Sequence, residues 1–169
     1  MDYKWIGAVL IISACGGFGF SLICTHRREE ATLRSLASAL DYMVSELHFK
    51  ATPLPELCRL TAEECDQGVD KIFTKLAHNL EMAEISDVRT CMDMALDNCD
   101  LPSATRRNLN LLGSSLGRFD LAGQLEGLET VRAACRRDLE TLSAGRDMRL
   151  RNYQTLSLCA GAALAILLI

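Results

Sequence analysis

Apolar residues recur along most of the chain every three or four positions, which is the spacing of one face of a helix. No stretch shows the strict alternation of apolar and polar residues that is typical of strands. Six such stripes can close around a single core, so we expect an all-α bundle of about six helices. The stripes are Leu33, Leu36, Leu40, Met43 and Leu47; Leu54, Leu57, Cys58 and Cys65; Val69, Ile72, Phe73, Leu76 and Leu80; Val88, Cys91, Met92, Ala95 and Cys99; the segment from Pro102 to about Leu116; and Leu121, Leu125, Leu128, Val131, Cys135, Leu139 and Leu142.

Proline, glycine and aspartate mark the expected ends of these helices. Thr52-Pro53 predicts a rigid turn after the first helix, because proline disfavours helical backbone in the residue before it. Gly68 and Gly117 predict the ends of the second and fifth helices, since glycine adopts the left-handed backbone that stops a helix. Asp120 is a typical residue for capping the start of the sixth helix.

Both ends of the chain are apolar and almost free of charge. Trp5 to Cys24 is an uncharged run of roughly 20 residues, long enough as a helix to cross the hydrocarbon core of a bilayer. Tyr153 to Ile169 is a second uncharged run near the lower length limit for a span, with a buried terminal helix as its alternative. We therefore expect an N-terminal transmembrane helix at 1–25, a central helical bundle at 26–151 and a C-terminal transmembrane helix at 152–169.

Basic residues flank the two runs on the side of the central domain, at Arg27, Arg28, Arg34, Arg146, Arg149 and Arg151. Because positive residues stay cytoplasmic, we expect a cytoplasmic central domain with both termini outside. One alternative stays open. Ile12 to Cys15 resembles the cleavage motif of bacterial lipoproteins, which would make the chain an exported lipoprotein or cell-envelope factor anchored through Cys15. The apolar run continues past Cys15 and is followed by arginines, which favours two spans.

Composition adds mainly exclusions. Among 169 residues the formal net charge is −4, so the chain lacks the basic footprint of a nucleic-acid-binding protein. Its 8 cysteines include no C-x-x-C pair, so we expect no metal site and read the cysteines of the central domain as small core residues. No phosphate-binding loop, H-E-x-x-H or G-x-S-x-G motif is present. We therefore expect neither an enzyme nor a cofactor or small-molecule substrate.

Two motifs between the apolar ends carry a family resemblance. The first runs from Leu47 to Glu56 and contains Thr52-Pro53. The second runs from Leu112 to Gln124 and contains Gly113 and Gly117. In this order, between two apolar ends, the chain resembles the stage III sporulation protein AB family of endospore-forming bacteria. That family's domain is similar to the cytoplasmic domains of platform proteins in type II secretion and type IV pilus systems.

The resemblance implies a function that the residues alone do not give. It implies a non-enzymatic platform component of the secretion-like channel between mother cell and forespore, on the mother-cell side of the outer forespore membrane. Its partners would be the sporulation secretion-type ATPase, protein AA, and other channel components. Platform domains usually carry a glutamate directly after the first glycine of the second motif. Here that residue is Ser114, so no charged role is carried over to it.

The second motif has two physical interpretations. Gly113 and Gly117 lie four residues apart on one helix face, where each glycine costs roughly 1 kcal/mol relative to alanine. One interpretation is close packing of the fifth helix on the sixth. The other is a partner-binding surface formed by Gly113, Gly117, Arg118, Asp120 and Gln124. Thr52 and Pro53 are interpreted as a structural turn.

Overall fold

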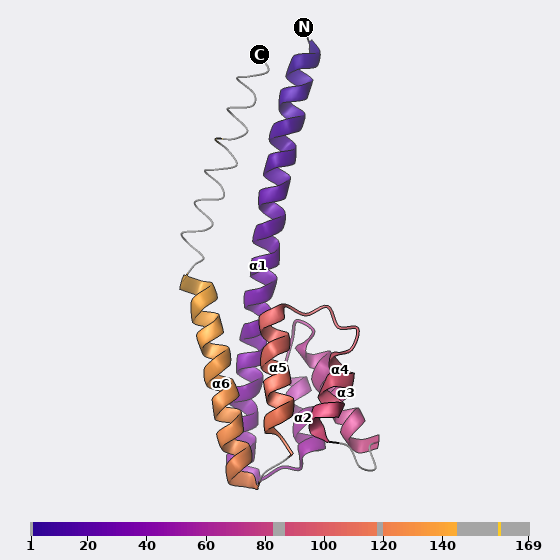
Figure 1. The fold of residues 1–169 in the computed structure, drawn as a ribbon, viewed down its shortest axis with the longest axis vertical. Coiled ribbons are helices and arrows are strands. Elements are labelled where there is room, and N and C mark those ends of the chain that lie inside the picture. The colour runs from indigo at the N-terminus through magenta and orange to yellow at the C-terminus, as the bar shows by residue number, and fades with distance from the viewer. Residues whose placement is uncertain (1, 83–86, 118–119, 145–158, 160–169) are drawn as a thin grey trace. The chain divides into compact units, whose positions relative to one another are not determined.

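The computed structural model describes residues 2–82, 87–117, 120–144 and 159, with side chains described from Cys24 onward. Within these residues all regular structure is helical. The helices are α1 (Asp2–Lys50), α2 (Leu54–Glu63), α3 (Val69–Met82), α4 (Val88–Leu96), α5 (Ser103–Ser115) and α6 (Leu121–Ala144) (Figure 1). The prediction of an all-α protein with six helices is therefore confirmed.

The chain divides into two compact units, one formed by residues 1–28 and 141–169 and the other by residues 29–140. In the first unit, α1 is helical from Asp2 onward. The predicted second span, Tyr153 to Ile169, lies outside the described residues except for Cys159. Across the described part of the chain, no helix combines the length and hydropathy that a membrane crossing needs.

The core of the unit 29–140 follows the predicted stripes closely. Every residue predicted for the inner face of the first helix within this unit is buried, and Phe73 of α3 is the largest side chain in the core. The stripe on α6 is buried only at Leu128, Val131 and Cys135, while Leu121 at its start is 44% exposed. The middle of α6 therefore makes its contact with the core.

Neighbouring helices along the chain pack on each other in sequence, α2 on α3, α3 on α4 and α4 on α5. The last helix closes the bundle against the first, and α1 and α6 run in opposite directions there (Figure 1). The Cys135 thiol donates to the carbonyl oxygen of Leu33 at 3.5 Å. Asp41 of α1 forms ion pairs with Arg136 at 2.9 Å and Arg132 at 3.5 Å.

The segment between α2 and α3 is tied to α1 by one serine. The Ser35 hydroxyl donates to the carbonyl oxygen of Asp66 at 3.0 Å and accepts the N–H of the same residue at 2.9 Å. The second helix ends at Glu63, well before Gly68, so the predicted end was wrong. Gln67 and Gly68 both have left-handed backbone, with φ of 60° and 87°, and turn the chain into α3.

Candidate partner surface around helices α4 and α5

Gly113 lies where α5 crosses α4. It is buried, and a Cβ atom at this position would stand 2.7 Å from Cβ and 2.9 Å from Cγ of Met92. Real Cβ atoms do not approach that closely, so only glycine lets the two helices meet at this distance. The cost of a glycine inside a helix is offset here by close packing.

Gly117 also faces α4, at Val88, and is subject to a second constraint. It follows the end of α5 with φ of +77°, a conformation that costs an L-residue roughly 1–2 kcal/mol. A Cβ atom would lie 3.2 Å from Cβ of Val88 and would overlap its Cγ2. The glycine therefore turns the chain and also makes room for the first residue of α4.

The expectation that these glycines pack α5 on α6 was wrong, because their shared face is turned towards α4. The close approach of α5 and α6 is made instead by Gly127. A Cβ atom there would lie 2.8 Å from Cβ of Ser115 and 3.3 Å from its carbonyl oxygen. The sequence offered a signal for this contact, since a glycine in the middle of a helix needs a compensating role.

The five residues predicted as a partner surface have different situations. Gly113 is buried, so its backbone does not lie on the surface, whereas Gly117 is exposed. Arg118 lies outside the described residues. Asp120 stands at the N-cap of α6, where its Oδ1 accepts the N–H of Gly123 at 3.0 Å. Gln124 is half-buried, and its backbone N–H donates to the carbonyl oxygen of Asp120 at 2.9 Å.

Thr52 and Pro53 lie in the turn between α1 and α2. α1 ends at Lys50, and Ala51 has left-handed backbone with φ of 49°. Pro53 is the N-cap of α2, and its carbonyl oxygen accepts the N–H of Leu57 at 2.8 Å. Thr52 is half-buried. These contacts give the pair a structural role in redirecting the chain.

A groove of about 510 Å³ lies between α4 and α5. Sequence reasoning missed it, because its two walls are contributed by separate helices and no motif spans both. The adjacent pair Arg106-Arg107 was the one visible signal. The lining residues are Arg89, Asp93, Ser103, Arg106, Arg107, Asn110, Leu111 and Ser114.

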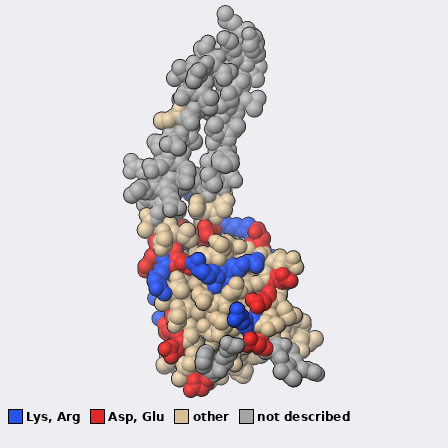
Figure 2. All heavy atoms as spheres, viewed as in Figure 1, with Lys and Arg blue, Asp and Glu red and all other residues tan. Residues whose placement is uncertain are grey.

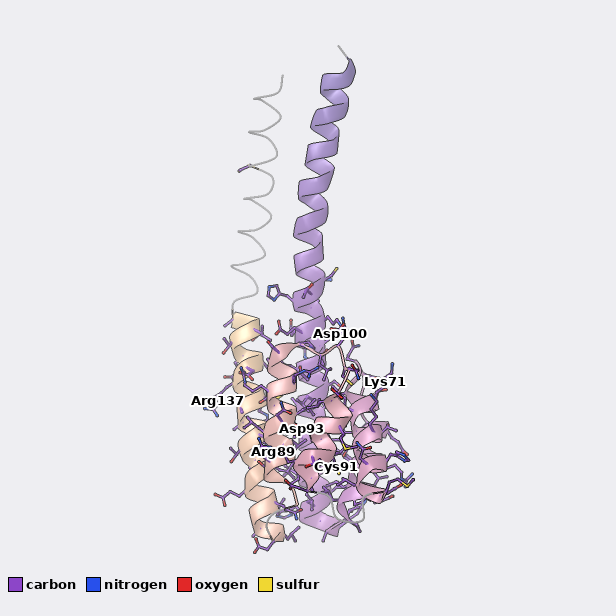
Figure 3. All side chains as sticks on the ribbon, turned by 45° about the vertical axis from the view of Figure 1, so that its right-hand side comes forward. Lys71, Arg89, Cys91, Asp93, Asp100 and Arg137 are labelled. Carbon is purple, nitrogen blue, oxygen red and sulfur yellow. The ribbon has the colours of Figure 1, made fainter. Side chains whose placement is uncertain are left out.

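The arginines of the groove differ in what they contact. Arg107 pairs with Asp138 of α6 at 2.7 Å. Arg106 donates to the carbonyl oxygen of Cys99 at 2.6 Å. Arg89 is exposed and has no hydrogen bond or ion pair within the described part of the chain. On the face shown in Figure 2, Lys and Arg side chains lie across the middle of the bundle, with Asp and Glu side chains beside them. Arg89 and Asp93 lie close together on α4, whereas Lys71 lies away from them (Figure 3).

Three buried cysteines of the bundle have thiols of low reactivity. Burial raises the pKa of the Cys58 thiol to about 12. It also raises the pKa of the Cys65 thiol to about 12 and, together with Asp138 and Asp41, that of Cys135 to about 11. A protonated, buried thiol is a poor nucleophile and a poor metal ligand. No group of three metal-binding side chains occurs among the described residues.

The family model described as stage III sporulation protein AB matches residues 4–169. A curated relative, the stage III sporulation protein AB of Bacillus subtilis (strain 168), is 25% identical over 172 residues, and the match covers 98% of each chain. A solved structure of a stage III sporulation protein AB shares the fold, with a TM-score of 0.62 and 20% identity over 72% of this chain and 98% of the other. The chain therefore belongs to the stage III sporulation protein AB family.

Proposed function

We propose that this chain is a non-enzymatic membrane platform component of the secretion-like channel between mother cell and forespore. It couples the sporulation ATPase, protein AA, to the outer forespore membrane. Residues 26–151 form its cytoplasmic bundle on the mother-cell side, and residues 1–25 and 152–169 anchor it as two spans. The family match over nearly the whole chain supports a role in sporulation.

The observation that carries the coupling role is the continuity of α1. One helix from Asp2 to Lys50 includes the uncharged run Trp5–Cys24 and the buried stripe that begins at Leu33. Proline is a common cause of a sharp kink, so a helix that lacks it between these two parts supports the passing of movement from the bundle towards the uncharged run. No proline or flexible linker occurs between the two parts.

Two features support the non-enzymatic part of the proposal. The buried thiols have raised pKa values, which argues against their use as nucleophiles. The groove between α4 and α5 is lined mainly by arginines and polar residues, with Asp93 as its one carboxylate and no histidine for general acid–base work.

The direct test is binding of the purified full-length chain, held in detergent micelles, to the cognate ATPase with and without ATP. Co-elution and calorimetry should show a complex whose affinity changes with nucleotide. An unrelated two-span protein in the same detergent is the control. A well-folded chain that fails to bind the ATPase in either nucleotide state would overturn the coupling role.

The anchoring is tested separately in sporulating cells. Protease added to intact mother cells should spare residues 26–151, and the mature protein should retain its first residues. A chain cleaved before Cys15 and lipidated there, with a bundle open to protease, would establish the exported lipoprotein instead.

A further inference from the structure

We infer that the groove between α4 and α5 binds an acidic segment of a partner protein. The inference concerns the chemistry of the partner and holds whether or not that partner is the ATPase. It starts from two arginines on different helices, Arg89 of α4 and Arg106 of α5, which line the same groove.

The positive charge of the groove is only partly compensated. Asp138 neutralises Arg107, whereas Arg106 is held by a backbone carbonyl, which leaves its charge without a carboxylate. Arg89 has no ion pair in the described residues, and Asp93 is the one acid among the groove's lining residues. The whole chain has a net charge of −4, so the positive charge of the groove is opposite in sign to that of the chain. Guanidinium groups bind carboxylates with paired hydrogen bonds, so acidic side chains are their natural partners.

The shape of the groove fits a stretch of polypeptide. Its wall on α5 runs from Ser103 to Ser114, which is about 16 Å of helix at 1.5 Å per residue. A volume of about 510 Å³ exceeds the needs of a single inorganic anion. Leu111 is 44% exposed on this wall and offers an apolar contact beside the arginines. The best occupant is therefore a segment that combines carboxylates with at least one apolar side chain.

Other anionic partners fit the groove less well. Nucleic acid would meet an acidic protein whose groove contains no aromatic side chain for base stacking. A membrane presents its headgroups as a broad surface, whereas these arginines line a recess between two helices. A second copy of the chain is distinguished by the experiment below.

The experiment uses the full-length chain in sporulating cells, with a photo-crosslinking amino acid in place of Asn110, in the groove. The same amino acid in place of Lys71, away from Arg89, is the positional control (Figure 3). We expect Asn110 to crosslink to an acidic segment of another protein, identified by sequencing the joined peptides. A synthetic peptide of that segment should then bind the purified chain, measured by fluorescence anisotropy.

Charge reversal gives the decisive comparison. Arg89→Glu should weaken peptide binding about tenfold or more, the scale of losing a charge-assisted contact, and Arg106→Glu should act in the same direction. Lys71→Glu makes the same change in net charge outside the groove and should leave binding unaltered. Because Arg89 has no partner to lose in the described fold, its variant should also unfold at the wild-type temperature.

Several results would overturn the inference. They are equal peptide binding by Arg89→Glu, crosslinks to lipid, nucleic acid or a second copy of the chain, or no crosslink from a folded chain. Binding of the ATPase that survives Arg89→Glu and Arg106→Glu would exclude the ATPase as the occupant of the groove while leaving the proposed function intact. An acidic segment captured from a protein other than the ATPase would support the groove as a binding site and would place the ATPase contact elsewhere on the chain.

Discussion

Two helix contacts in the unit 29–140 are made in opposite ways. α5 meets α4 through glycines, so that Gly113 and Gly117 face Met92 and Val88 with no room for a further carbon atom. α6 meets α1 through side chains, with Cys135 in the core and Asp41 paired to two arginines at the surface. The α4–α5 contact depends on the absence of side chains at two positions, whereas the α1–α6 contact depends on side chains that interact.

This difference determines which kind of substitution weakens each contact. Close-packed backbones give way when volume is added, since a packed interior has little space to absorb it. An exposed ion pair is weak because water and salt compete with it. We therefore expect the addition of one methyl group at either glycine to destabilise the fold more than the loss of the ion pairs at Asp41.

The largest effect is expected for Gly117→Ala. The substitution combines left-handed backbone with overlap against Val88, so the free energy of unfolding should fall by roughly 2–5 kcal/mol. Chemical denaturation followed by circular dichroism measures the change. Gly68→Ala is the matched control, because Gly68 also has positive φ but has no atom within 4 Å of the added Cβ. Equal losses in the two variants would mean that the α4 contact is not tight.

Gly113→Ala should have an intermediate effect. Its Cβ overlaps Met92, at a cost of about 1–3 kcal/mol, while alanine recovers roughly 1 kcal/mol of helix propensity. The net loss in denaturation experiments should therefore be smaller than for Gly117→Ala. Replacing Met92 by glycine in the same chain removes both atoms that the added Cβ meets and should reduce that loss, and two strictly additive effects would argue against direct contact.

Asp41→Asn should have a small effect, below about 1 kcal/mol, because the ion pairs with Arg132 and Arg136 are partly exposed to water. The difference from wild type should shrink further in high salt. Thermal unfolding at low and high ionic strength tests this. A loss as large as that of Gly117→Ala would mean that the α1–α6 contact depends on charge after all.

The smallest effect in neutral solution concerns the Cys135 thiol, whose folded pKa of about 11 lies above its ordinary value of 9.0. A raised pKa contributes stability that is complete below the unfolded pKa and is lost as pH rises through the folded pKa. Stability should therefore stay constant up to about pH 9 and decline between about 9 and 11. Cys135→Ala should show a weaker decline over this range in denaturation at several pH values. In native protein at pH 8, Cys135 should resist alkylation because its thiol is buried and protonated, whereas it should react once the chain is unfolded.

The sequence predicted the helices better than it predicted their neighbours. The stripes that begin at Leu33 and Val69 led directly to buried faces, because helical spacing alone decides which residues share a side. The same spacing placed Gly113 and Gly117 together but could not say which helix they faced. α2 ended before Gly68 because its last turn tightens: the N–H groups of Glu64 and Cys65 bond to the carbonyl oxygens three residues earlier. The groove could not be predicted from the sequence, since Arg89 and Arg106 come to line one groove only when α4 and α5 pack together.

The bond between the Cys135 thiol and the Leu33 carbonyl joins residues 102 positions apart, and this has a consequence for biosynthesis. A bacterial ribosome adds roughly 5–20 residues per second, so α6 emerges several seconds after the α1 stripe that it covers. Helices α2 to α5 meet partners adjacent in the chain and can assemble in the meantime. The side of α1 that waits for α6 stays uncovered during this interval, which makes the nascent chain most prone to aggregation just before its last helix is made.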